Sequence, residues 1–65
     1  MHAMTVLIRL IDGPLRFEIH RMPRYFTALT VAGYTYIPNM IKVGTALRPE
    51  KDALGAYLFH YKPGG

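Results

Sequence analysis

Apolar and polar positions alternate along the first third of the chain in a pattern typical of β-strands. Residues 5–11 are aliphatic or β-branched apart from Arg9, a composition that favours a strand. Val6, Ile8 and Leu10 share one face of that strand, and the other face is also mostly apolar. The pattern predicts a central strand that is covered on both sides.

A turn and a second strand follow. Asp12-Gly13-Pro14 favours a turn, because glycine adopts positive φ without steric cost and proline cannot donate to a strand ladder. Residues 15–20 alternate, which predicts a half-buried strand with Leu15, Phe17 and Ile19 on its inner face. Residues 5–19 are therefore predicted to form a β-hairpin on which the rest of the sheet is built.

Further strands are predicted from the middle of the chain. The expected segments are 25–31, 34–37 and 40–47, separated by turns at 32–33 and 38–39. Pro23 ends the second strand or carries it round a bend, and Gly44 marks a weak point or bulge in the 40–47 strand.

Residues 49–61 allow two interpretations. A helix from Pro49 would place Leu54, Tyr57, Leu58 and Tyr61 on one face, with an acidic first turn. Gly55 in its middle would cost about 1 kcal/mol relative to alanine. The favoured interpretation is a polar turn over 49–54 followed by a strand over 56–61.

Chain length and composition narrow the fold class. Sixty-five residues, 51% of them hydrophobic and none of them cysteine, indicate one folded domain without disulfides. A domain of this size buries only about 60% of its unfolded surface, so packing alone or self-association must stabilise it. We predict an all-β domain over 5–62, with four or five antiparallel strands in a meander or a small SH3-like barrel, and a short helical turn near 49–54 as an option. Residues 1–4 are expected to be disordered and 63–65 frayed, and residues 1–3 are an upstream extension or a cloning remnant if Met4 is the natural start.

The net charge of +4, with a pI near 9.8, is only weak evidence about the partner of the protein. A basic chain favours anionic partners, but scattered cations also serve solubility, which is the favoured interpretation here. The nearest approach to a cluster is a candidate anion-binding set of Arg16, His20, Arg21 and Arg24. No apolar segment reaches the ~20 residues of a membrane span, and no signal peptide is recognisable, so a cytoplasmic protein is expected.

Candidate chemistry is sparse. The positions of the four carboxylates are explained by a turn, a solvent-exposed strand face and a polar loop. The three histidines are not spaced as metal ligands. Serine is absent, and neither GxGxxG nor GxxxxGK[ST] occurs. We therefore expect no enzymatic activity, no metal and no cofactor.

Aromatic residues are the stronger signal. They recur at alternate positions of the two predicted strands 34–37 and 56–61 and form a candidate interface, Tyr34, Tyr36, Tyr57, Phe59 and Tyr61. Packing in the core is the favoured explanation, followed by a tyrosine-rich protein interface and then by a stacking platform for single-stranded nucleic acid.

Two short motifs resemble small uncharacterised proteins of actinobacteria and their tailed phages. IRLIDGPL at 8–15 is similar to that family's apolar strand and Gly-Pro-Leu turn, and 18–23 suits its second strand. DALG at 52–55, followed by YLFHY at 57–61, resembles its acidic-Leu-Gly turn and closing aromatic strand. The family's usual Asp-Gly insertion after Gly-Pro-Leu is missing here. The resemblance implies a small phage- or prophage-encoded β protein and implies no activity.

These observations predict a non-enzymatic protein-interaction module with a role in virion assembly or in binding a host protein, located in the host cytoplasm or the virion. Self-association is expected, because both faces of the first strand are apolar and the chain has no covalent staple. A small basic nucleic-acid-binding β-barrel is the alternative.

Overall fold

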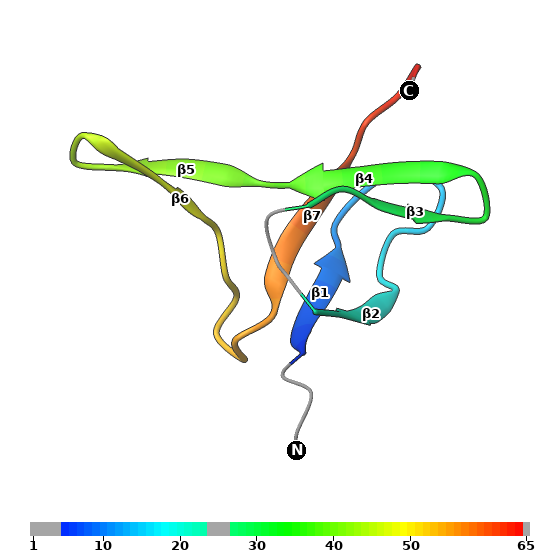
Figure 1. Cartoon of the computed structure of the whole chain (residues 1–65), viewed down its shortest axis with the longest axis horizontal. Helices are drawn as coiled ribbons and strands as arrows, with labels where there is room; N and C mark the ends of the chain where they lie inside the picture. The colour runs from blue at the N-terminus through cyan, green and yellow to red at the C-terminus, as the bar shows by residue number, and fades with distance from the viewer. Residues whose placement is uncertain (1–4, 24–26, 65) are drawn as a thin grey trace.

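A computed structural model describes residues 5–23 and 27–64 of the chain (Figure 1). Its strands are β1 (Val6–Leu10), β2 (Ile19–Met22), β3 (Leu29–Val31), β4 (Tyr34–Pro38), β5 (Met40–Val43), β6 (Ala46–Pro49) and β7 (Tyr57–Tyr61). The described residues contain no helix, so the all-β prediction is confirmed and both helical options for 49–61 are wrong. The predicted ends at 1–4 and 65, and part of the predicted strand 25–31, lie outside the described residues.

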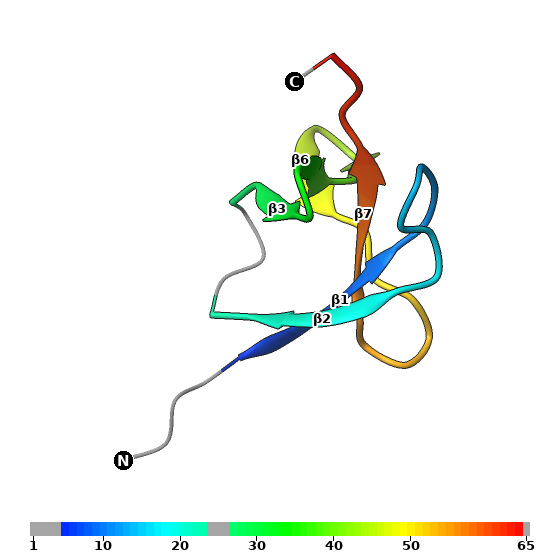
Figure 2. The ribbon, with the colours of Figure 1, turned by 90° about the vertical axis from the view of Figure 1, so that its right-hand side faces the viewer.

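Five strands form one mixed sheet in the order β2-β1-β7-β4-β3, and β5 pairs with β6 in a separate two-stranded sheet. The larger sheet curls into a half-barrel (Figure 2). The β1–β7 pairing is parallel, whereas all other pairings of named strands are antiparallel. The expectation of a wholly antiparallel meander is therefore wrong. Alternation shows that a strand exists but not which strand it pairs with, and here the last strand inserts between the first and the fourth.

The core lies on one face of the five-stranded sheet. Ile8, Leu10, Tyr36 and Phe59 are completely buried, and Met22 joins them at 8% exposure. Burying a side chain of this size contributes about 1.5–3 kcal/mol, so these few residues supply much of the stability of the domain. Val6, Ile8 and Leu10 were predicted to share one face of the first strand, and the structure shows that this face is the one that packs in the core.

The second strand begins later than expected, and its faces are reversed. Residues 14–17 form a turn, and β2 starts at Ile19. His20 lies opposite the buried Ile8, so Ile19 belongs to the outer face. The prediction that Phe17 and Ile19 point inward is wrong, since they are 80% and 56% exposed. An extra residue in the strand shifts the alternation by one, and this exchanges the two faces.

The predicted strand over 40–47 is a hairpin. β5 and β6 meet at Val43 and Ala46, which leaves a two-residue turn, and Gly44 adopts a φ of 63° at its first position. Glycine at that position is what a tight turn of this kind requires. The other turns and strands agree better with expectation: Ala32 and Gly33 form the predicted turn between β3 and β4, and the closing strand follows a polar turn.

Candidate interaction surface

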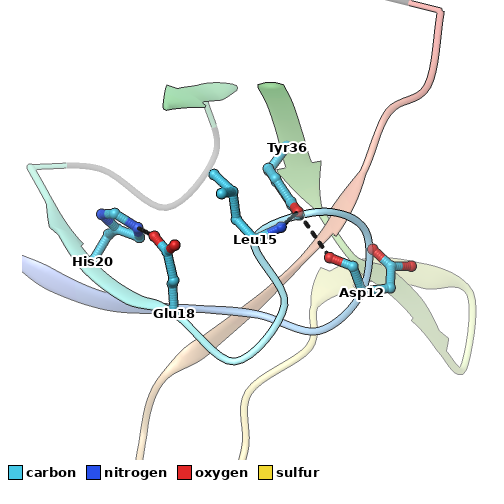
Figure 3. Close-up of polar contacts among 5 residues, drawn as sticks. All are labelled: Asp12, Leu15, Glu18, His20 and Tyr36. Carbon is cyan, nitrogen blue, oxygen red and sulfur yellow. Dashed lines mark hydrogen bonds and ion pairs between the residues drawn. The ribbon is translucent and has the colours of Figure 1, made fainter. Parts of the chain in front are cut away.

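The Tyr36 hydroxyl group fastens the 12–18 turn to the sheet (Figure 3). It accepts a hydrogen bond of 2.9 Å from the Leu15 backbone N–H and donates one of 2.8 Å to the Asp12 carbonyl oxygen. The Asp12 carboxylate in turn accepts a hydrogen bond from the Tyr61 N–H at 2.6 Å. The buried Tyr36 ring thereby places its polar end on the turn, which fixes the loop that leads into β2.

Gly13 lies directly against this arrangement. Its φ is +74°, and a Cβ atom added there would lie 2.5 Å from the Tyr61 Cβ and 2.8 Å from the Tyr36 hydroxyl oxygen. Non-bonded carbon atoms normally approach no closer than about 3.5 Å. Position 13 therefore requires glycine for two reasons, its left-handed backbone and the lack of space.

Phe17 occupies a strained bulge at the end of the same turn. Its N–H donates to the Leu10 carbonyl oxygen at 2.8 Å, while the Leu10 N–H donates to the Glu18 carbonyl oxygen at 3.0 Å, so two residues oppose one. The φ of Phe17 is 75°, in the region where this kind of bulge normally has glycine. A side chain there costs about 1–2 kcal/mol, and the ring is 80% exposed, so packing within this chain does not explain its presence.

Among residues 5–23 and 27–64, no strand pairs with the outer edge of β2, because β2 is the last strand of the sheet on that side. Ile19 is 56% exposed beside it. Glu18 and His20 form a side-chain hydrogen bond of 2.8 Å (Figure 3). Because side chains alternate along a strand, this pair lies on the face opposite to Ile19. Phe17, Ile19, Glu18, His20 and Arg21 are called the β2 edge from here on.

A second exposed surface is the hairpin of β5 and β6, which we call the arm and which extends away from the five-stranded sheet (Figure 1). Every residue of β5 and most of β6 are exposed, including Val43 at 51% and Leu47 at 68%. The cross-strand pairs place Met40, Lys42, Leu47 and Pro49 on one face and Ile41, Val43, Ala46 and Arg48 on the other. Each face thus carries three apolar residues and one cation.

The base of the arm is firmly held by hydrogen bonds. β4 ends at Pro38, and the next residue, Asn39, still donates its N–H to the Leu58 carbonyl oxygen of β7 at 2.9 Å. After the hairpin, residues 50–52 lie beside β7 instead, and the Leu58 N–H donates to the Glu50 carbonyl oxygen at 3.0 Å. The Asn39 side-chain amide donates to the Glu50 carboxylate, and its oxygen accepts from His60 Nδ1 at 3.1 Å. This junction connects the arm to the centre of the sheet.

Asp52 organises the turn between the arm and β7. Its carboxylate accepts hydrogen bonds of 2.9 Å from the Leu54 and Ala56 N–H groups and lies 3.4 Å from Arg9 Nε. The hydrogen bond from Ala56, with those from Leu54 and Gly55 and the charge of Arg9, lowers the pKa of the Asp52 carboxyl below its ordinary 3.8, although burial opposes the shift. The ion pair with Arg9 connects this turn to β1.

The structure separates the candidate anion-binding residues. Arg16 is exposed in the 14–17 turn, whereas the neighbours His20 and Arg21 in β2 point to opposite faces. His20 already has Glu18 as its partner. Arg24 lies outside the described residues. The described members of the set do not converge on one point.

The five candidate interface aromatics are also divided. Tyr36 and Phe59 are fully buried core residues, which agrees with the favoured explanation for them and removes them from any exposed surface. Tyr34 is 38% exposed, and Tyr57 and Tyr61 are half-buried. Tyr61 packs against both tyrosines of β4, with ring centroids 6.1 Å from Tyr34 and 5.5 Å from Tyr36, and the Lys51 ammonium lies 5.1 Å from the Tyr57 ring centroid.

Sequence reasoning missed both surfaces described here. The signal for the arm was Gly44-Thr45 between two apolar segments, which is a hairpin signature rather than a strand with a bulge. No comparable signal marks Phe17, because a left-handed phenylalanine is an exception to the rule that such positions favour glycine.

Other kinds of site are not seen in the part of the chain that the structure describes. Residues 5–23 and 27–64 hold no group of three or more His, Asp or Glu side chains suited to a metal, no pocket, and no helix that could cross a membrane. Comparisons with protein-family models, curated proteins and solved structures gave no significant match.

Proposed function

We propose that this protein is a non-enzymatic interaction module that binds a protein partner through the arm. The observation that carries the proposal is the exposure of Met40, Ile41, Val43 and Leu47 on a hairpin that adds nothing to the core. Two-stranded hairpins are only marginally stable in water by themselves. An apolar hairpin held at its base but uncovered on both faces is therefore well suited to insertion into a partner.

The charge of the arm defines the chemistry of that partner. Lys42 and Arg48 are the only charged residues between positions 40 and 49, and they lie on opposite faces. A complementary site is an apolar groove bordered by carboxylates, in which the groove supplies affinity and the carboxylates orient the hairpin. In line with the resemblance noted in the sequence, we propose that the partner is a virion component or a bacterial host protein.

A random peptide library displayed on phage and selected against the whole protein tests this proposal. We expect enrichment of peptides that combine aromatic or aliphatic residues with Asp or Glu. Binding of the synthesised peptides, measured by fluorescence anisotropy, should weaken at least ~10-fold in Leu47→Glu and in Val43→Glu, because each places a carboxylate on one face of the arm.

Leu54→Glu is the matched control, since Leu54 is 81% exposed in the turn before β7 and outside the arm. It should bind the peptides as the unsubstituted protein does. Selected peptides that bind all four proteins equally would show that the arm is not the binding surface.

The nucleic-acid alternative was predicted from Arg16, Arg21, Arg24 and exposed tyrosines. The structure adds Lys42 and Arg48 on the exposed arm, because a basic hairpin also suits a phosphate backbone. It predicts binding of random single-stranded DNA or RNA that is strong at low salt and decreases steeply as salt rises. Absence of binding at low salt removes this alternative, and Lys42→Gln with Arg48→Gln locates any binding that is found.

A further inference from the structure

We propose that the β2 edge is a self-association site, at which the open edges of two copies of this chain pair antiparallel across a two-fold axis. This goes beyond the arm, which belongs to the separate two-stranded sheet. The proposal rests on three features of the β2 edge: a backbone with which no strand of the described residues pairs, an exposed strained phenylalanine, and a sequence that is complementary to itself.

The first feature is the direction of the backbone groups. In an antiparallel ladder, residues alternate between those bonded to the neighbouring strand and those whose N–H and C=O point away. The Leu10 N–H donates to the Glu18 carbonyl oxygen, and the register pairs Ile8 with His20. His20 is therefore a position whose N–H and C=O point toward β1, whereas Ile19 and Arg21 present theirs to the outer edge of β2. Such an edge is a template for another strand.

The second feature is Phe17. A left-handed backbone at φ 75° disfavours its side chain, and 80% exposure means that the ring packs against little within the chain. Glycine or asparagine would suit the bulge better. A large aromatic side chain in a rigid turn, immediately beside an open strand edge, has the properties of an interface anchor.

The third feature is the pairing that a two-fold axis imposes. With the axis at Ile19, each Ile19 meets its counterpart, and position 21 of the second copy falls opposite Phe17. Glu18 comes opposite His20 of the second copy, so the Glu18–His20 pair that each chain already forms meets its equivalent with opposite charges facing. These are an apolar pair, a cation–aromatic pair and an acid–base pair.

Neighbouring registers are less favourable. An axis at Glu18 would oppose two carboxylates, and an axis at His20 would oppose two imidazoles and leave Glu18 opposite Met22. The self-complementarity at Ile19 is what identifies the second copy, rather than another protein, as the occupant.

Sedimentation velocity of the full chain, from about 5 to about 500 µM, tests the proposal. The edge is short, so we expect a reversible dimer with a dissociation constant of roughly 10–100 µM. Ile19→Lys places two like charges on the axis and should leave a monomer across the whole range. Phe17→Gly removes the ring without introducing backbone strain and should weaken dimerisation at least ~10-fold.

Leu54→Lys and Leu47→Glu are the controls, one at a remote turn and one in the arm, and neither should change the dimer. A monomer at every concentration would overturn the proposal, as would an Ile19→Lys variant that dimerises normally. Loss of the dimer in Leu47→Glu would also overturn it, because the arm would then be the self-association surface. Far-UV circular dichroism of each variant establishes that a lost dimer is not a lost fold.

Discussion

Replacing Gly13 with alanine provides a direct test of how the first turn is fixed. The added methyl group must enter a space where the Tyr61 Cβ lies 2.5 Å away and the Tyr36 hydroxyl oxygen 2.8 Å away. Neither neighbour can move freely, because Tyr61 belongs to the central strand β7 and the Tyr36 hydroxyl holds Asp12 and Leu15.

Three effects determine the magnitude. A left-handed alanine costs about 1–2 kcal/mol, which is partly offset by about 0.4–1 kcal/mol from the reduced freedom of the unfolded chain. Overpacking of a tight site adds about 1–3 kcal/mol. Displacing the Tyr36 hydroxyl weakens two hydrogen bonds that each contribute about 1 kcal/mol. These ranges add up to a loss of about 1–7 kcal/mol, centred near 4 kcal/mol, set against a total of about 3–10 kcal/mol for a 65-residue domain.

Thermal unfolding followed by circular dichroism measures this loss, and Gly33→Ala is the matched control. Gly33 also has a positive φ, at +85°, but a Cβ atom there would meet nothing within 4 Å. The control should lose at most about 1.6 kcal/mol, since it experiences only the backbone effect. Gly13→Ala should lower the Tm by at least ~10 °C.

The comparison of the two variants separates the effect of crowding at position 13 from the effect of a left-handed backbone. If Gly13→Ala and Gly33→Ala lose equal stability, position 13 is not crowded, and the close approach of the turn to Tyr36 and Tyr61 is refuted. A Gly13→Ala protein as stable as the parent chain would refute the left-handed backbone as well.

Three further predictions concern Tyr36, Phe17 and Asp52. Tyr36→Phe should cost about 1–3 kcal/mol in chemical denaturation, because the Leu15 N–H and the Asp12 carbonyl lose their partner; an unchanged midpoint would count against the contact. Phe17→Gly should be more stable than Phe17→Ala by about 0.5–1 kcal/mol, since only alanine retains the strained Cβ, and the opposite order would exclude the left-handed bulge. The lowered pKa of Asp52 means that its ionised form stabilises the fold above pH 3.8 and that this contribution disappears as the pH falls through the folded-state pKa. The Tm of the parent chain should therefore fall more steeply with acid than that of Asp52→Asn, and parallel Tm–pH curves would contradict this.

The sequence predicts the fold class and most strand positions because these depend on local alternation. β1, β4 and β7 lie close to where their apolar and aromatic residues indicate, and the turns at Gly13 and Gly33 follow from glycine chemistry. The faces of β2 could not be predicted in the same way. They depend on one extra residue at the bulge before β2. The Tyr36 hydroxyl, 21 positions further along the chain, helps to fix this bulge by accepting a hydrogen bond from the Leu15 N–H.

The partner of each strand was also beyond local reasoning. Nothing in residues 57–61 indicates that this strand should pair parallel with β1, since a parallel pair needs only a long connection between its strands. The candidate interaction surfaces likewise depend on contacts that local patterns do not show. Buried aromatics such as Phe59 were explained as core by their composition, whereas the exposure of Leu47 emerged only once Gly44 was known to reverse the chain.

The way the arm joins the sheet has a consequence for how this protein can change over evolution. Its two ends are already adjacent, because the Glu50 N–H donates to the Asn39 carbonyl oxygen at 2.8 Å, and residues 50–52 continue the sheet as β7's neighbour. Residues 40–49 can therefore be shortened, lengthened or exchanged for another hairpin while the β7 ladder and the core remain unchanged. Under the proposed function, the residues that bind the partner are different from the core residues that stabilise the fold, so selection on folding need not filter mutations that alter binding.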